Sequence, residues 1–152
     1  MLECTFELNG KDMSALRCGT LAFPAFSGLH GYKNRPEFSC HAGSGPIPRG
    51  TYYIFDRQSG GMFGSIKDAF RGKNEWFALY AVDGKIDDVA FCNSVQRGEF
   101  RLHPKGGQGI SKGCITVESH MGFHHLRALL KGQRQTSVPG TTLKAYGRVI
   151  VR

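Results

Sequence analysis

One stretch of the chain indicates both its fold class and its chemistry: Arg101-Leu-His-Pro-Lys-Gly-Gly-Gln-Gly-Ile-Ser-Lys-Gly-Cys-Ile-Thr-Val117. It places His103 and Cys114 on either side of a glycine-rich loop, and residues typical of strands flank both ends. Two adjacent strands joined by such a loop can bring an imidazole within about 2.6–3.2 Å of a thiol, which is the reach that a thiol nucleophile needs from its base. We interpret this stretch as a cysteine active site.

The residues next to the thiol suit nucleophilic catalysis. A cysteine with a pKa near 8.5 is only slightly ionised at neutral pH, so His103 is expected to take the proton and form a thiolate–imidazolium pair. The backbone N–H groups of Gly113 and Cys114 are candidates for an oxyanion hole, a contribution of about 3–4 kcal/mol. Ser111 either orients His103 or only shapes the turn. The alternative for Cys114 itself is a buried structural cysteine.

Charged side chains in the same stretch are candidates for substrate binding. Arg101, Lys105 and Lys112 would favour the thiolate and could hold substrate carboxylates. A solvated face is the alternative for all three. His41, in the loop before a proline-containing motif, either lines the substrate cleft or is an ordinary loop residue.

Composition limits the class of protein. The 152 residues carry 20 Lys and Arg against 12 Asp and Glu, a net charge of +8, which favours acidic partners without choosing among them. Neither a secretory signal nor a run of about 20 apolar residues is visible, so we expect synthesis in the cytoplasm and no membrane span. The five cysteines include no Cys-x-x-Cys pair, and we expect neither metal nor cofactor. Apart from Cys114, four cysteines remain, which either pair in an oxidising compartment or pack as buried thiols.

The pattern along the chain predicts one mostly β domain over residues 1–152. Stretches rich in β-branched and aromatic residues predict strands at 5–8, 21–26, 51–56, 76–82, 89–93, 100–103, 114–118 and 143–151. Asp83-Gly84 predicts a hairpin turn between the fourth and fifth of these. A helix is expected from Ser119, as its N-cap, to Gly132, and a weaker helical pattern spans 65–70. The aromatic residues of the strands are assigned to the core, Trp76 among them.

Two motifs resemble a known family. Ser111-Lys-Gly-Cys-Ile115 is similar to the Ser/Thr-x-Gly-Cys-hydrophobic signature of the L,D-transpeptidase catalytic domain, with His103 as the upstream histidine. Ser44-Gly-Pro-Ile-Pro-Arg-Gly-Thr-Tyr-Tyr-Ile54 resembles the loop and strand that precede that family's active site. The resemblance covers about half of the chain. It implies a β-sandwich or mixed sheet with one helix after the cysteine strand.

The resemblance also implies a function. Such enzymes form an acyl-enzyme on the cysteine with peptidoglycan stem peptides, release a terminal D-amino acid, and pass the acyl group to water or an amine. Lys112 and Thr116 depart from the family pattern, and the interval from His103 to Cys114 is short. These features resemble the compact L,D-transpeptidase toxins delivered by type VI secretion, which act in the periplasm of a target cell. A monomer is expected, and a cognate immunity protein would be a partner.

Two other readings remain open. A cysteine peptidase or amidase of another fold would use the same pair of residues, although His before Cys is the less usual order there. A basic β module that binds nucleic acid would explain the net charge of +8. That second alternative leaves both motifs unexplained, and exposed aromatic residues beside clustered arginines are not visible, which argues against nucleic acid as the partner.

Overall fold

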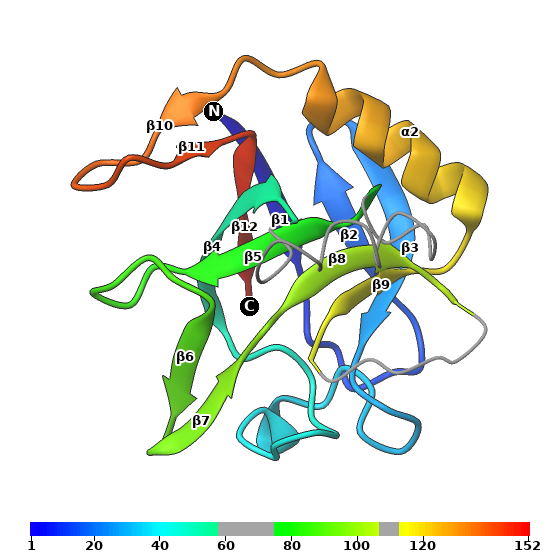
Figure 1. Ribbon diagram of the computed structural model, residues 1–152. Coiled ribbons are helices and arrows are strands. Elements are labelled where there is room, and N and C mark those ends of the chain that lie inside the picture. Colours follow the sequence, from blue (N-terminus) through cyan, green and yellow to red (C-terminus); the bar gives the residue numbers. More distant parts are fainter. Residues whose placement is uncertain (58–74, 107–112) are drawn as a thin grey trace.

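The computed structural model of the protein describes residues 1–57, 75–106 and 113–152 (Figure 1). The weaker helical pattern at 65–70 and the candidate site residues Ser111 and Lys112 lie outside these ranges.

Eight strands form a closed barrel, in which each strand bonds to the next in the following order: β1 (Leu2–Phe6), β12 (Gly147–Val151), β4 (Gly50–Asp56), β5 (Phe77–Ala81), β8 (Arg101–Pro104), β9 (Ile115–Val117), β3 (Leu21–Ser27) and β2 (Ser14–Cys18). β1 and β12 pair in parallel, as do β8 and β9, and the remaining pairs are antiparallel. The mostly β class is therefore confirmed, and the sheet is mixed.

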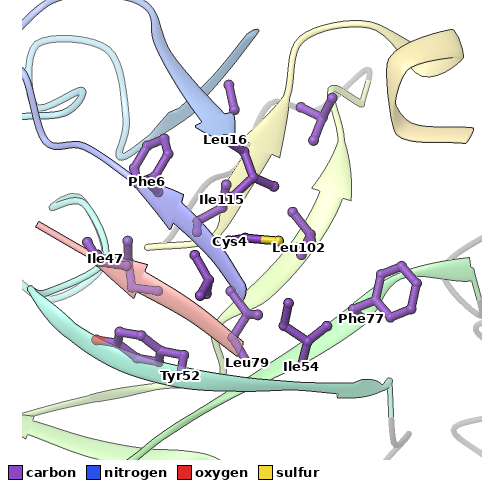
Figure 2. Packing of buried hydrophobic residues seen from close by; sticks show 14 of the residues in the cluster. Cys4, Phe6, Leu16, Ile47, Tyr52, Ile54, Phe77, Leu79, Leu102 and Ile115 are labelled. Atoms are coloured by element: carbon purple, nitrogen blue, oxygen red, sulfur yellow. The ribbon is translucent and has the colours of Figure 1, made fainter. Parts of the chain in front are cut away.

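The core fills the barrel because side chains alternate between its inside and its outside. On β8 and β9, Leu102 and Ile115 point inward and are fully buried. Figure 2 shows them among inward-facing residues of the other strands, including Phe6, Ile54 and Phe77. The residues on either side of Leu102 and Ile115 therefore lie on the outer face of the barrel, and the candidate site is built from them.

One helix, α2 (His120–Lys131), follows β9 as expected (Figure 1). Ser119 is its N-cap, and the Ser119 hydroxyl accepts a hydrogen bond of 2.8 Å from the backbone N–H of Gly122. Its apolar face adds Phe123, Leu126 and Leu130 to the barrel core. Within the described ranges, no helix is long and apolar enough to cross a membrane.

Two small hairpins lie outside the barrel, β6 (Val89–Cys92) with β7 (Val95–Gly98) and β10 (Thr136–Ser137) with β11 (Lys144–Ala145). The predicted hairpin at Asp83-Gly84 is wrong, because β5 pairs with β4 and β8 while β6 pairs with β7. Asn93 and Ser94 make the tight turn instead, both with positive φ. Serine is not typical of that conformation, so the sequence pattern did not indicate the turn.

Four of the five cysteines form disulfides. Cys4 and Cys18 lie directly opposite each other on β1 and β2, inside the barrel. Cys40 and Cys92 join the segment after the short 3-10 turn η1 (Pro36–Phe38) to strand β6. Cys114 carries a thiol. Of the two states that the sequence left open for these four residues, the paired one is present.

The N-cap of α2 gives a direct test of how firmly the helix is held after β9. We expect Ser119→Ala to lower the free energy of unfolding by about 1 kcal/mol, because the N–H of Gly122 loses its acceptor. Denaturant titration followed by circular dichroism measures this loss. Ser119→Asp, which keeps an acceptor at the N-cap, should retain most of the stability, and equal losses in both variants would contradict a capping role.

Candidate active site

The parallel pairing of β8 with β9 brings the two candidate catalytic residues to one surface. In its register Leu102 lies opposite Ile115, and His103 lies opposite Thr116. Since Leu102 and Ile115 point into the barrel, His103 and Thr116 point outward. Cys114 directly precedes β9 and, by the same alternation, lies on the outer side with Arg101. The structure thus brings His103, Cys114 and Arg101 together on one face.

His103 is held from two directions. Its Nδ1 lies 2.7 Å from the backbone carbonyl oxygen of Pro104, so Nδ1 carries the proton and donates to that oxygen. The Nε2 atom then has the lone pair and can act as a base. The indole ring of Trp76 stacks on the imidazole with ring centres 4.2 Å apart and planes at 18°. The side chain of His103 is only 5% exposed, so the stacked arrangement fixes the ring in a water-poor setting.

Trp76 corrects the assignment of every strand aromatic to the core. It lies one residue before β5, next to Phe77, which points into the barrel, so Trp76 faces outward and is half-buried. The antiparallel register of β5 with β8 places it beside His103. The guanidinium of Arg57 lies 5.3 Å from the centre of the Trp76 ring on the outer surface. No local pattern separates such a residue from the core aromatics, because its role depends on which strand is its neighbour.

Cys114 lies in an environment that opposes ionisation. It is 7% exposed, and burial raises the pKa of its thiol above the ordinary value. A hydrogen bond from the backbone of Arg101 and the positive charges of Arg101 and Arg57 lower the pKa, whereas the carboxylate of Asp88 raises it. Burial outweighs the nearby cations. Burial thus favours the neutral thiol, and the thiolate–imidazolium pair expected from the sequence stays a prediction.

Two of the candidate substrate-binding cations are already engaged by carboxylates. The guanidinium of Arg101 binds Asp88 through two hydrogen bonds of 2.7 and 2.6 Å. Lys105 forms an ion pair of 3.2 Å with Glu118. A substrate carboxylate would compete with these partners. His41 is exposed and stacks on Tyr32 with ring centres 5.1 Å apart.

A cleft of about 420 Å³ lies near these residues. Its lining residues are Ala42, Gly43, Asp88, Val89, Gln96, Arg97, Gly98 and Glu99. His41 immediately precedes the two loop residues of this lining, so it stands at the border of the cleft. Asp88 connects the cleft to the nucleophile, because the same carboxylate that lines it binds Arg101.

Gly113 occupies a position that only glycine fits. Its φ of +98° lies in the left-handed region, and a Cβ there would overlap the guanidinium of Arg97 and the ring of Phe100. Close packing before Cys114 therefore holds the backbone from which the predicted oxyanion donors come.

Two buried polar residues lie near the site. Thr116, noted in the sequence only as a departure from the family pattern, is 3% exposed and lies opposite His103, and its hydroxyl has no hydrogen-bond partner in the part of the chain that the structure describes. Arg97 on β7 is 6% exposed and contacts the segment before Cys114. Arg97 was not indicated by the sequence, because it lies on a short strand with no recognisable motif and only the contacts of the folded chain mark it.

The stack on His103 predicts a measurable effect of Trp76 on thiol reactivity. We expect Trp76→Leu to lower the rate constant for alkylation of Cys114 by iodoacetamide about 2- to 10-fold, the equivalent of the 0.5–1.5 kcal/mol that an aromatic pair contributes. Trp76→Phe keeps an aromatic face and should retain most of the rate. A rate unchanged in Trp76→Leu would show that the stack does not orient the imidazole.

The pH dependence of alkylation tests the state of the thiol. Because burial raises the pKa of Cys114, its thiolate accumulates only above the ordinary pKa of about 8.5, so the rate should still rise beyond that pH. Asp88→Asn should move the rise to lower pH, since it removes the negative charge while Arg101, Arg57 and Arg97 remain. Asp87→Asn, on the same turn, is the matched control. A plateau at or below neutral pH would instead indicate a preformed ion pair with His103.

Comparison with known proteins identifies the family to which the chain belongs. The family model described as the Tlde1 domain matches residues 21–141, most of the chain and all of the candidate site. No curated protein and no solved structure matched. The family is one of type VI secretion effectors, which agrees with the effector group that the two motifs resemble. The chain thus belongs to the Tlde1 domain family of type VI secretion effectors.

Proposed function

We propose that this protein is a cysteine enzyme that modifies peptidoglycan by L,D-carboxypeptidase or L,D-transpeptidase chemistry on tetrapeptide stems. The observation that carries the proposal is the register of β8 with β9, by which His103, Cys114 and Arg101 share one outer face. Asp88, which binds Arg101 on that face, lines a cleft. The second motif that resembles L,D-transpeptidases reaches this region through Gly45, whose carbonyl oxygen accepts a hydrogen bond from Arg97 next to Gly113. The whole barrel acts as one catalytic domain, as a monomer.

The chemistry begins with proton transfer from the Cys114 thiol to Nε2 of His103. The sulfur attacks the carbonyl carbon of the amide bond that links the L-centre of the diamino acid to the terminal D-alanine. The proton then passes from His103 to the leaving nitrogen, D-alanine departs, and a thioester remains on Cys114. Water or the amine of another D-amino acid attacks the thioester, which gives hydrolysis or exchange. Because Nδ1 of His103 donates to Pro104, the ring can accept and return the proton without rotating.

Stabilisation of the tetrahedral intermediate is assigned to backbone donors. The N–H groups of Gly113 and Cys114 are proposed to bind the oxyanion, and close packing of Gly113 against Arg97 keeps that backbone in place. Arg101, Lys105 and Lys112 are proposed to attract the stem carboxylates, with Asp88 and Glu118 as the partners displaced from the first two. The net charge of +8 favours approach to an anionic polymer.

The proposed site of action is the periplasm of a target cell. Peptidoglycan lies there, and two disulfides are stable in an oxidising compartment but rare in the cytosol. Delivery by type VI secretion would bring the protein to this compartment. A producing cell that meets the same toxin from its siblings would need an immunity protein, which we propose as the partner.

Mass spectrometry of purified tetrapeptide muropeptides tests the activity. We expect the wild-type protein to release the terminal D-alanine and, with D-methionine added, to replace it. Cys114→Ala and His103→Ala should each lower the rate by at least about 10³-fold, as loss of a nucleophile or its base does in comparable enzymes. His125→Ala changes an exposed histidine of α2 and serves as the matched control.

The controls separate the chemistry from folding. Circular dichroism and thermal unfolding should match wild type in each variant. Release of D-alanine by purified Cys114→Ala would overturn the mechanism. Unchanged muropeptides with the wild-type protein, with and without D-methionine, would overturn the proposed activity itself.

A further inference from the structure

Arg97 joins two parts of the protein that are far apart in sequence. Its guanidinium donates hydrogen bonds to the backbone carbonyl oxygens of Ser39, His41 and Gly45, at 3.2 Å for His41 and 3.1 Å for Gly45. All three acceptors lie in one segment, residues 36–45, which we name the clamp loop. Burial lowers the pKa of this guanidinium. The three carbonyl oxygens offset the cost of burying its positive charge. Arg97 thus fastens the clamp loop to hairpin β6–β7.

The same guanidinium also contacts the backbone next to the nucleophile. A Cβ at Gly113 would overlap Nη2 of Arg97, so the two residues touch. An ionised Cys114 would raise the pKa of Arg97, so the two groups lie close enough to interact electrostatically. One side chain therefore links the clamp loop, the hairpin and the residue that precedes Cys114. If Arg97 moved away, Gly113 would lose this packing contact and the backbone before Cys114 could shift.

A disulfide forms a second link between the same two elements. Cys40 lies in the clamp loop between two of the carbonyl acceptors of Arg97, and Cys92 lies on β6. In the hairpin register Ala90 pairs with Arg97 and Cys92 with Val95, so Cys92 and Arg97 face the same side. Figure 1 shows the hairpin and the segment that carries η1 on the same side of the barrel. The clamp loop and the hairpin, which these two links hold together, both contribute residues to the lining of the cleft.

The hairpin needs such links because little else supports its fold. It is a sheet of only two strands, separate from the barrel, and sheets of that size are marginal alone. Phe91 on its outer side is 67% exposed and adds little packing. The disulfide Cys4–Cys18 differs in this respect, because it joins two strands that are already paired within the barrel.

We propose that Arg97 is a positioning residue for Cys114, and that the Cys40–Cys92 disulfide holds it in place, so that the site becomes competent only after this disulfide forms. The inference rests on the proposed function and names how the site is regulated. Oxidation removes two protons and two electrons from the thiols of Cys40 and Cys92. An external disulfide accepts them and becomes two thiols. The effector would thus be weakly active in a reducing cytosol and fully active in an oxidising periplasm.

Two matched double variants test the disulfide. We expect Cys40→Ala/Cys92→Ala to lower both the release of D-alanine and the alkylation rate of Cys114 about 10- to 100-fold, the effect of a displacement of about 1 Å in an active site. Cys4→Ala/Cys18→Ala should stay within about twofold of wild type in both rates, although it also loses a disulfide and some thermal stability. Both variants are assayed below their unfolding temperatures, with folding checked by circular dichroism.

Reduction gives an independent arm of the test. Treatment with a phosphine reductant should lower D-alanine release by wild type and by Cys4→Ala/Cys18→Ala. It should not change Cys40→Ala/Cys92→Ala further, because that variant has already lost the disulfide in question. The kcat should fall and the KM change little, since the proposal concerns the placement of the nucleophile.

Arg97→Lys and Arg97→Met test the positioning role directly. Lysine keeps the charge but cannot reach three carbonyls from a planar fork, so both variants should lose alkylation rate while remaining folded. Full activity of Cys40→Ala/Cys92→Ala, or an equal loss in Cys4→Ala/Cys18→Ala, would overturn the inference. If alkylation of Cys114 depends on the bridge but no form releases D-alanine, the positioning holds and the proposed function fails.

Discussion

The parallel hydrogen bonding of β8 to β9 is the constraint on which the site depends. Parallel strands run in the same direction, so no tight hairpin turn joins β8 to β9. Paired residues share a face, as do residues two apart on one strand, so the imidazole of His103 and the thiol of Cys114 lie on the same outer face. The inward side chains Leu102 and Ile115 fix this register, because a slip by one residue would turn them outward and point their polar neighbours into the barrel.

Burial of the site sets its chemistry as much as its geometry does. A thiol that is 7% exposed has a pKa above its ordinary value in spite of the arginines around it, so the proposed reaction would rely on His103 to take its proton. The environment of the imidazole suits that role, with Nδ1 bonded to a carbonyl and the ring face covered by Trp76. Ion pairing of Arg101 with Asp88 moderates the positive charge.

Contacts outside the barrel also hold the region of the candidate site in place. Arg97 and the Cys40–Cys92 disulfide fasten the β6–β7 hairpin to residues 36–45, and Gly113 packs against the same guanidinium. The hydrogen bonds of Arg97 and the disulfide connect positions more than 50 residues apart. Neither strand of the hairpin belongs to the main sheet, and Ala90 is the one residue of the hairpin in the large apolar core, so the stability of this region depends largely on a few specific contacts. That difference allows the site region to respond to redox conditions while the barrel stays folded.

Local patterns in the sequence were enough to predict the mostly β class and the helix with its cap at Ser119. They also singled out His103 and Cys114 as the candidate pair. Strand periodicity, capping and motif spacing are all properties of neighbouring residues, which is why the sequence carries them. Closure into a barrel and the strand neighbours could not be predicted this way. The β6–β7 hairpin was missed since Asn93-Ser94 is a weak turn signal. Trp76, Asp88 and Arg97 became site residues only in the tertiary structure. Their roles come from contacts across strands and loops distant in sequence, and the burial that raises the pKa of Cys114 likewise exists only once those elements pack together.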